Sequence, residues 1–155
     1  MQVKFRMIHP EAKMPVYATS GSACFDFFSI ENTEITKGSP KVLRTGIEME
    51  IPEGYVMMLF SRSGHGFKNN IRLSNCTGII DSDFRQEIKI KLIQDVNNTN
   101  ESFKVLTNDR IGQGIILPYP EITFEEVVKT DVGISGKATF SVNAYLKVKY
   151  LPTPV

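Results

Sequence analysis

The chain has 155 residues, of which 41% are hydrophobic and 23% are charged, a composition typical of globular proteins. Its 18 basic and 17 acidic residues give a net charge of +1, so we expect no general attraction to nucleic acid or to an anionic membrane. No stretch is long and apolar enough for a transmembrane helix, and no signal peptide is recognisable, so we expect a cytoplasmic protein. Two cysteines and two histidines are too few for a disulfide framework or a zinc site.

Apolar and polar residues alternate in several segments, with the period of half-buried β-strands. These segments are 3–7, 47–51, 56–60, 88–92 and 144–150. Turn-forming residues lie between them, at 37–40, 52–54, 97–100, 108–109 and 118–120. The best candidate for a helix is one short turn near 61–69. Short strands at this spacing predict an all-β jelly roll or distorted barrel with little helix.

The chain is long enough for one continuous core, and we expect a β-barrel domain over residues 1–131. Residues 132–155 are expected to form a C-terminal arm, because a stretch of small residues precedes the alternating segment 144–150. Two interpretations of this arm stay open. It is either a flexible lid or a linker to a final structural strand.

The segment between an apolar run ending at Ile80 and the alternating strand 88–92 is expected to be the turn of a hairpin. It contains Asp81, Asp83 and Phe84, followed by an arginine. Two carboxylates, an aromatic ring and a guanidinium suit a place where a small polar ligand is held and a water is deprotonated. The alternative is a solvated turn, since Asp and Ser are common turn residues.

Two further segments set polar side chains beside glycine. Gly-Ser-Ala-Cys-Phe-Asp, ending at Asp26, places a lone carboxylate just before a pair of phenylalanines. The segment 61–64, Ser-Arg-Ser-Gly, follows the strand expected at 56–60, and its hydroxyls, guanidinium and backbone N–H groups suit phosphate oxygens. For Asp26 the alternative is a turn acid that is hydrogen-bonded to the backbone.

A fourth polar segment, 108–113, has the same character. It adds the carboxamide of Gln113, a hydrogen-bond donor at the mouth of a strand. Asp109 and Arg110 in the same segment are expected to form an ion pair that fixes a turn, in preference to contacting a ligand.

In this order the four segments resemble the first four motifs of the trimeric deoxyuridine triphosphatase (dUTPase) family. The third, Asn-x-x-Gly-Ile-Ile-Asp-x-x-Phe-Arg-x-Glu, is the most specific, and the resemblance spans about residues 15–117. Several positions depart from the family pattern. Ser61 stands where the family has Pro, and Cys24, Gln86 and Asn108 stand where it has Gly.

The resemblance implies a jelly-roll homotrimer with active sites at the subunit interfaces, and it assigns roles to residues. Asp81, in preference to Asp83, would orient the attacking water and contact the deoxyribose 3′-hydroxyl. Phe84, where the family usually has Tyr, would pack under the sugar and exclude a 2′-hydroxyl. Asp26 would hold waters of a magnesium ion (Mg²⁺) that the phosphates chelate. The implied substrate-binding residues are Asn75, Gly78 and Ile80 for the nucleoside, and Arg62, Ser63, Gly64 and Gln113 for the phosphates.

The fifth motif of the family, Arg-Gly-x-Gly-Gly-Phe-Gly-Ser-Thr-Gly, is divergent here. The nearest stretch is 132–141, with Val132 and Lys137 at the usual Arg and Phe positions. Lys137 could supply the phosphate charge and Phe140 the ring over uracil. The alternative is that this stretch is only a linker.

The reaction that the resemblance implies is hydrolysis of dUTP to dUMP and pyrophosphate by magnesium-assisted attack of water on the α-phosphate. Such an enzyme keeps uracil out of DNA and supplies dUMP for dTMP synthesis. Two alternatives stay open. One is an enzyme similar to dCTP deaminase, which needs a Glu as proton shuttle, and the other is a nucleotide-binding regulator with this fold and weak turnover.

Overall fold

The computed structural model describes residues 1–97 and 102–124. Met1–Pro118 forms one compact unit, and a second unit begins at Tyr119. Four expectations fall outside the described residues: the domain boundary after residue 131, the strand at 144–150, and the roles of Lys137 and Phe140. Within the described ranges, no helix has the length and apolar character needed to cross a membrane.

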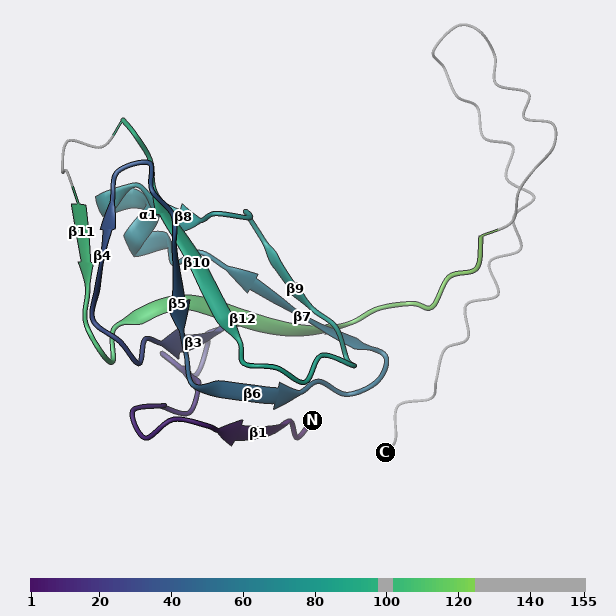
Figure 1. Cartoon of the computed structure of the whole chain (residues 1–155). Helices are drawn as coiled ribbons and strands as arrows, with labels where there is room; N and C mark the ends of the chain where they lie inside the picture. Colours follow the sequence, from purple (N-terminus) through teal and green to yellow (C-terminus); the bar gives the residue numbers. More distant parts are fainter. Residues whose placement is uncertain (98–101, 125–155) are drawn as a thin grey trace, which may run out of the picture. The chain divides into compact units, whose positions relative to one another are not determined.

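Short β-strands make up nearly all of the regular secondary structure in the described chain, which confirms the expected all-β fold (Figure 1). The strands are β1 (Lys4–Met7), β2 (Val16–Tyr17), β3 (Phe25–Phe28), β4 (Thr33–Thr36), β5 (Lys41–Arg44), β6 (Ile47–Glu50), β7 (Tyr55–Phe60), β8 (Ile71–Leu73), β9 (Gly78–Ile80), β10 (Lys89–Gln94), β11 (Ser102–Val105) and β12 (Arg110–Pro118). The helix expected near residues 61–69 is confirmed as α1 (Ser63–Asn69).

The strands pair in antiparallel fashion, as a jelly roll requires. The largest sheet has the order β2-β3-β12-β7-β9, and a three-stranded sheet has the order β5-β10-β8. Two smaller pairs are β1-β6 and β11-β4. The five-stranded sheet matters most for function, because it contains or adjoins the four polar segments singled out in the sequence.

The core explains the alternation in the sequence. In β10, Ile90 and Leu92 are buried while Lys89 and Lys91 are exposed, as the period of two predicts. In β7 every second residue from Met57 faces the core. Met57 and Leu59 are fully buried there, and the alternating set at 56, 58 and 60 is only half-buried. β7 is a central strand of its sheet, none of its residues is exposed, and its sequence is apolar throughout.

The hairpin expected around Asp81 is wrong. β9 pairs with β7 in the five-stranded sheet, whereas β10 pairs with β5 and β8 in another sheet. The segment 81–88 therefore crosses between two sheets. Glu87 anchors it, with its carboxylate accepting hydrogen bonds from Arg44 Nε at 3.0 Å and from the Gly46 backbone N–H at 2.9 Å.

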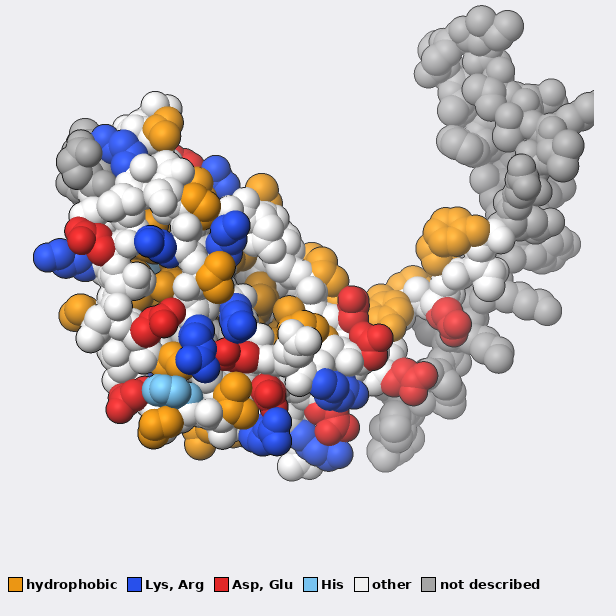
Figure 2. Space-filling view, viewed as in Figure 1, with side chains coloured by type: hydrophobic (Ala, Val, Ile, Leu, Met, Phe, Trp, Pro, Cys, Tyr) orange, Lys and Arg blue, Asp and Glu red, His pale blue; other side chains and the backbone are white. Residues whose placement is uncertain are grey.

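Positive and negative side chains are interspersed on the face of the molecule seen in Figure 2. Two cross-strand ion pairs between β1 and β6 contribute to this pattern, Lys4 with Glu50 and Arg6 with Glu48. Exposed pairs of this kind stabilise a fold only slightly.

Candidate functional site

Asp26 is a buried carboxylate in the middle of β3, with only 6% of the residue exposed. Each of its oxygens faces a guanidinium. Arg62 Nε lies 3.3 Å from Oδ1, and Arg110 Nη1 lies 3.2 Å from Oδ2. A buried carboxylate requires such partners, since burial of an unpaired charge is costly. The alternative in which Asp26 is a turn acid is therefore wrong, because the residue lies inside a strand and is paired with side chains.

Arg110 does not form the expected ion pair with Asp109, because its guanidinium points to Asp26. Asp109 does fix a turn. Its Oδ2 accepts a hydrogen bond from the Leu106 backbone N–H at 2.8 Å, and its own N–H donates to the Leu106 carbonyl at 3.0 Å. Asn108 in this turn has a φ of 75°, in the left-handed region that Asn tolerates better than most residues. The replacement of the family's Gly is thus compatible with the turn.

Gln113 lies directly beside Asp26 across the sheet. In the register of β12, Gln113 is opposite Asp26 on one side and opposite Phe60 on the other. Its Nε2 donates to the Ser61 carbonyl at 3.3 Å. The neighbouring Gly112 allows β12 to pack closely on β10, since a Cβ there would lie 2.7 Å from Ile90 Cδ1. The first, second and fourth polar segments therefore meet at one end of the five-stranded sheet.

Ser61 fixes the exit of the chain from β7. Its Oγ accepts a hydrogen bond from the Leu73 backbone N–H at 2.8 Å, which joins the end of β7 to the end of β8. Arg62 then precedes α1 with an extended backbone, and its carbonyl accepts the N–H groups of His65 and Gly66. Ser63 and Gly64 are exposed in the first helical turn, where backbone N–H groups lack partners within the helix.

His65 belongs to the same cluster, although sequence reasoning missed it. Its Nε2 lies 3.2 Å from Arg62 Nη1, and its ring packs edge-on against Phe103 with 5.2 Å between centroids. Burial, and then the charge of Arg62, lower the pKa of His65 from its ordinary value of 6.5. The available signal was its spacing of three residues from Arg62, which places both on one side of a helical turn.

The third polar segment contributes residues of mixed exposure. Asn75 is exposed in the turn before β9. Gly78 is buried, and a Cβ added at this position would lie 3.1 Å from Leu59 Cβ. Ile80 ends β9 and is half-buried against the core. Asp81 is exposed in the single chain.

Segment 81–84 is a tight turn, with the Phe84 backbone N–H donating to the Asp81 carbonyl at 3.2 Å. Asp83 is exposed in this turn. The side chain of Phe84 is half-buried and packs against the hydrophobic core of its own chain. The ring is therefore held in place before any ligand arrives.

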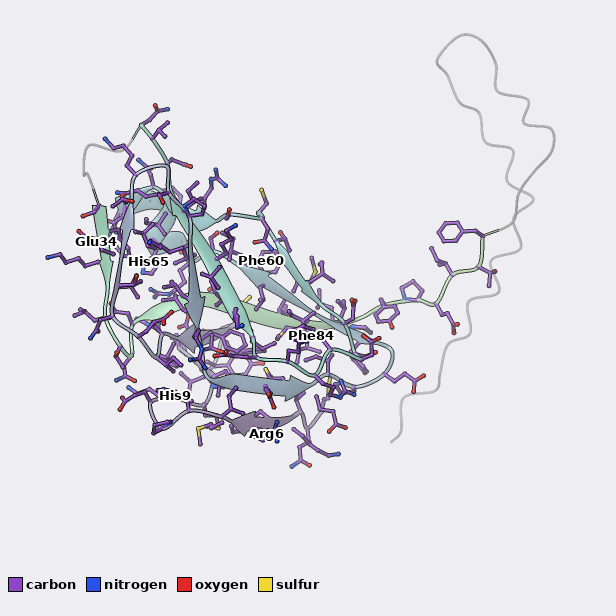
Figure 3. All side chains as sticks on the ribbon, viewed as in Figure 1. Arg6, His9, Glu34, Phe60, His65 and Phe84 are labelled. Atoms are coloured by element: carbon purple, nitrogen blue, oxygen red, sulfur yellow. The ribbon has the colours of Figure 1, made fainter. Side chains whose placement is uncertain are left out.

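Within one chain, Asp81 is far from Asp26. Ile80 is opposite Met57, so the same register continued by one residue puts Asp81 opposite residue 56. Residue 56 lies four residues along β7 from Phe60. Phe60 is aligned across the sheet with Gln113, and Gln113 with Asp26. Four residues along a strand and three strand spacings across the sheet give a separation of roughly 20 Å. Figure 3 shows the same relationship, with His65 and Phe84 at opposite ends of the barrel. The two halves of the predicted site do not meet within one subunit.

The protein groups near Asp26 are too few to coordinate a metal alone, so most ligands of a bound metal would be waters or phosphate oxygens. Among residues 1–97 and 102–124, no group of three or more His, Cys, Asp or Glu side chains could hold a metal ion. Asp26 supplies one carboxylate, whose oxygens are shared with two guanidinium groups. Mg²⁺ keeps several waters and commonly binds through one or two carboxylates together with phosphates. The arrangement is thus compatible with Mg²⁺ held by Asp26 through water.

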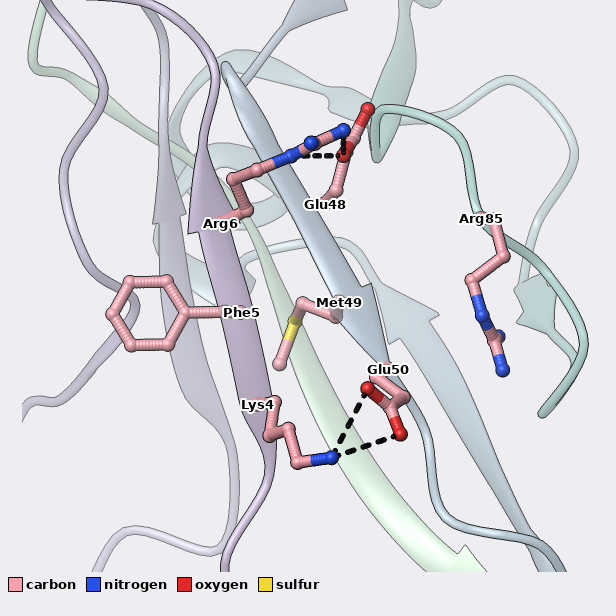
Figure 4. Close-up of a pocket in the computed structure, with 7 residues that line it drawn as sticks. All are labelled: Lys4, Phe5, Arg6, Glu48, Met49, Glu50 and Arg85. Carbon is pink, nitrogen blue, oxygen red and sulfur yellow. Dashed lines mark hydrogen bonds and ion pairs between the residues drawn. The ribbon is translucent and has the colours of Figure 1, made fainter.

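A separate cavity of about 340 Å³ lies over β1 and β6 (Figure 4). Its lining residues are Lys4, Phe5, Arg6, Glu48, Met49, Glu50 and Arg85. Its charged groups are largely paired with each other, and Arg85 donates to the carbonyls of Ser82 and Phe84. Asp26, Arg62 and Gln113 are not among the lining residues, so this cavity is distinct from the cluster around Asp26.

Comparison with known proteins places the chain close to one family. A family model described as dUTPase matches residues 10–141. The deoxyuridine 5′-triphosphate nucleotidohydrolase of Nautilia profundicola is 40% identical over 139 residues, which cover 88% of this chain and 96% of that protein. The protein of the same name from Helicobacter pylori (strain J99) is 34% identical, covering 90% of this chain and 94% of that protein.

Solved structures agree with the fold. A mutant dUTPase from phage phi11 of S. aureus superposes with a TM-score of 0.76 at 22% identity, covering 83% of this chain and 98% of that chain. A mutant Staphylococcus bacteriophage 80alpha dUTPase with dUpNHpp gives a TM-score of 0.77 at 22% identity, with 90% and 96% covered. At this level of identity the likeness concerns the fold alone.

Proposed function

The chain belongs to the dUTPase family and hydrolyses dUTP to dUMP and pyrophosphate, and we propose that it does so with Mg²⁺ in a site shared between the subunits of a homotrimer. The observation that carries this proposal is the meeting of Asp26, Arg62 and Gln113 at one end of the five-stranded sheet. We further propose a cytoplasmic location, in keeping with the expectation from the sequence.

The cluster around Asp26 is proposed to bind the triphosphate. The Arg62 side chain is 21% exposed, with Nε facing Asp26 and Nη1 in contact with His65 and the Arg110 carbonyl. A guanidinium held in this way has N–H groups left for phosphate oxygens. Ser63 and Gly64 would add backbone N–H groups from the first turn of α1, and Gln113 would add its carboxamide.

Asp26 would hold Mg²⁺ through water, while the phosphates supply direct ligands. When bound, the ion would neutralise charge on the triphosphate and orient it. The chain's own contribution is to fix the Asp26 carboxylate between two guanidinium groups at the strand end.

Asp81 is proposed as the general base. It would take a proton from a water whose oxygen forms a bond to the α-phosphorus, while the bond from that phosphorus to the bridging oxygen breaks and pyrophosphate departs. Its exposure leaves it open to water, and a carboxylate within one hydrogen bond of that water can accept the proton. Phe84 would pack under the deoxyribose. Asn75, together with the backbone of Gly78 and Ile80, would hold the uracil.

The separation within one chain supports a site that is shared between subunits. A base and a metal-holding carboxylate that act on one triphosphate cannot lie roughly 20 Å apart, the separation that the strand register gives here. A second copy must therefore supply Asp81 to the Asp26 cluster. Lys137 and Phe140 are proposed to reach the same site from a third copy.

A product assay tests the proposed function. The full-length protein is incubated with Mg²⁺ and with dUTP, dCTP or UTP, and nucleotides and pyrophosphate are resolved. Formation of dUMP and pyrophosphate from dUTP, with little hydrolysis of UTP, is the expected result. Conversion of dCTP to dUTP would instead identify a deaminase, and binding of dUTP without products would identify a regulator. Removal of Mg²⁺ with a chelator is expected to suppress turnover.

A further inference from the structure

His65 is the immediate neighbour of the guanidinium that faces Asp26. Arg62 Nη1 lies 3.2 Å from His65 Nε2, and the same Nη1 lies 3.4 Å from the Arg110 carbonyl. The imidazole is itself fixed, because its ring packs edge-on against Phe103 of β11 at an interplanar angle of 62°. A continuous set of contacts thus runs from Phe103 through His65 and Arg62 to Asp26.

The chemistry of the contact assigns the tautomer of His65. A guanidinium has only donors, so Nε2 must accept the hydrogen bond and carry no proton. The proton of the neutral ring therefore lies on Nδ1. That atom is buried, and no hydrogen-bond partner for it exists among the residues that the structure describes. A buried donor without a protein partner is costly, so the contact with Arg62, and not a partner at Nδ1, sets this tautomer.

We propose that His65 is a positioning residue, which holds the Arg62 guanidinium against Asp26 by accepting its Nη1 hydrogen bond and so orients Arg62 toward the triphosphate. This inference deepens the proposed function and rests on it for the role of Arg62. The contact with His65 restricts the orientation of the Arg62 guanidinium. Arg62 has several rotatable bonds, and a hydrogen bond at Nη1 together with the ion pair at Nε fixes the plane of the guanidinium.

The charged groups that face His65 come from each neighbouring element. They are Arg62 before α1, Asp26 of β3, Asp109 of the turn before β12, and Arg110 of β12, while β11 contributes the uncharged ring of Phe103. Two cations and two anions leave a site in which neutral imidazole is favoured by burial and by the nearest cation, Arg62. Neutral imidazole is the form that can accept from Arg62.

Three substitutions of His65 distinguish the loss of the hydrogen-bond acceptor from a change in the shape of the side chain. His65→Gln puts an amide oxygen at the position of Nε2 and keeps an acceptor for Arg62. His65→Asn puts the amide at the position of Nδ1, out of reach, and His65→Leu removes the acceptor altogether. We expect KM for dUTP to rise about fivefold in the Asn and Leu variants, with kcat changing by less than about twofold, because Arg62 binds phosphate in the ground state and the transition state alike. His65→Gln is expected to stay close to wild type.

A second measurement reports on Arg62 without any turnover. In the NMR spectrum of the full-length protein, the Arg62 Nε–H signal is expected to exchange slowly with water in wild type and in His65→Gln, and faster in His65→Asn and His65→Leu. Melting temperatures of all four proteins show whether they are equally folded. Should His65→Leu fold poorly, the comparison of Gln with Asn carries the test.

The outcomes separate this inference from the proposed function. If wild type does not hydrolyse dUTP, the proposed function fails, and the exchange of Arg62 Nε–H still tests the role of His65. If wild type hydrolyses dUTP while His65→Asn and His65→Leu keep both the wild-type KM and slow exchange at Arg62, the positioning role of His65 is wrong.

Discussion

Arg110 and Asp26 are 84 residues apart in the sequence, yet Arg110 Nη1 donates a hydrogen bond to Asp26 Oδ2 at 3.2 Å. The pairing of β12 with β3 brings them together, and Arg62 completes the arrangement from the end of β7. The Asp26 side chain is 8% exposed, whereas that of Arg110 is 45% exposed. The buried carboxylate therefore has these two guanidinium groups as its charged partners.

Removing Arg110 should destabilise the protein. Arg110→Met keeps much of the apolar stem but leaves Asp26 with one cationic partner, and we expect a loss of about 1–2 kcal/mol in the free energy of unfolding, less than for a fully buried pair because Arg110 is partly exposed. Urea denaturation at fixed protein concentration measures it. Arg72→Met is the matched control, since the Arg72 and Asp95 side chains are 46% and 44% exposed and their pair should contribute less than about 0.5 kcal/mol. Equal losses in the two variants would contradict the role of Arg110.

Asp81→Asn should abolish turnover while leaving nucleotide binding largely intact. The amide keeps the shape of the side chain but cannot accept the proton of the attacking water, so we expect kcat to fall by about 10²- to 10⁴-fold. Steady-state kinetics and calorimetric binding of a non-hydrolysable dUTP analogue measure the two effects. Asp83→Asn is the matched control, an exposed acid in the same turn that should retain near-wild-type kcat. A wild-type kcat in Asp81→Asn would rule out Asp81 as the base.

Mixed subunits should recover activity that neither parent has. Asp81→Asn and Gln113→Ala are each expected to be nearly inactive, because one removes the base and the other a phosphate contact. In a trimer whose sites take these residues from different chains, reassembly of the two variants restores some intact sites. Light scattering should give a mass near three chains of 17.4 kDa each. A monomeric mass, or no recovery after verified subunit exchange, would contradict the shared site.

Phe84→Ala should weaken the selection for deoxyribose. A ring that lies against the sugar leaves no room for a 2′-hydroxyl, so its removal is expected to raise hydrolysis of UTP relative to dUTP. Because Phe84 also packs against the core, the variant is expected to lose stability as well. Phe84→Tyr, which keeps the ring and restores the residue usual in the family, is the control. The measurement is the ratio of kcat/KM for UTP to kcat/KM for dUTP. An unchanged ratio in Phe84→Ala would show that another residue excludes the 2′-hydroxyl.

Stability should fall on acidification in a way that depends on His65. Burial and Arg62 lower the pKa of His65 in the folded state below 6.5, so the unfolded chain binds more protons there than the folded one. The stabilisation present above pH 6.5 is lost as pH falls through the folded pKa. Urea denaturation between about pH 7.5 and pH 5 should therefore show a steeper decline in wild type than in His65→Gln. Identical profiles for wild type and His65→Gln would show that the imidazole does not titrate in this way.

Local features of the sequence were enough to predict the fold class and the family. The alternation of Lys89, Ile90, Lys91 and Leu92 specifies a half-buried strand, because side chains on a strand alternate between its faces. The short helix after β7 also follows from neighbouring residues. The ordered polar segments indicated the dUTPase family without any knowledge of which strands pair.

Only the tertiary structure decided which distant residues meet. The pairing of β9 with β7 and of β10 with β5 and β8 turned an expected hairpin into a crossover, because a strand pairs with whichever neighbour completes its hydrogen bonds and buries its apolar face. Likewise, the partner of Arg110 is Asp26 and not the adjacent Asp109, since a buried carboxylate needs a cation far more than an exposed one does. The contact of His65 with Arg62 is likewise a result of the tertiary structure. Its role depends on Arg62 being turned inward by Asp26, and residue order alone carries no information about that contact.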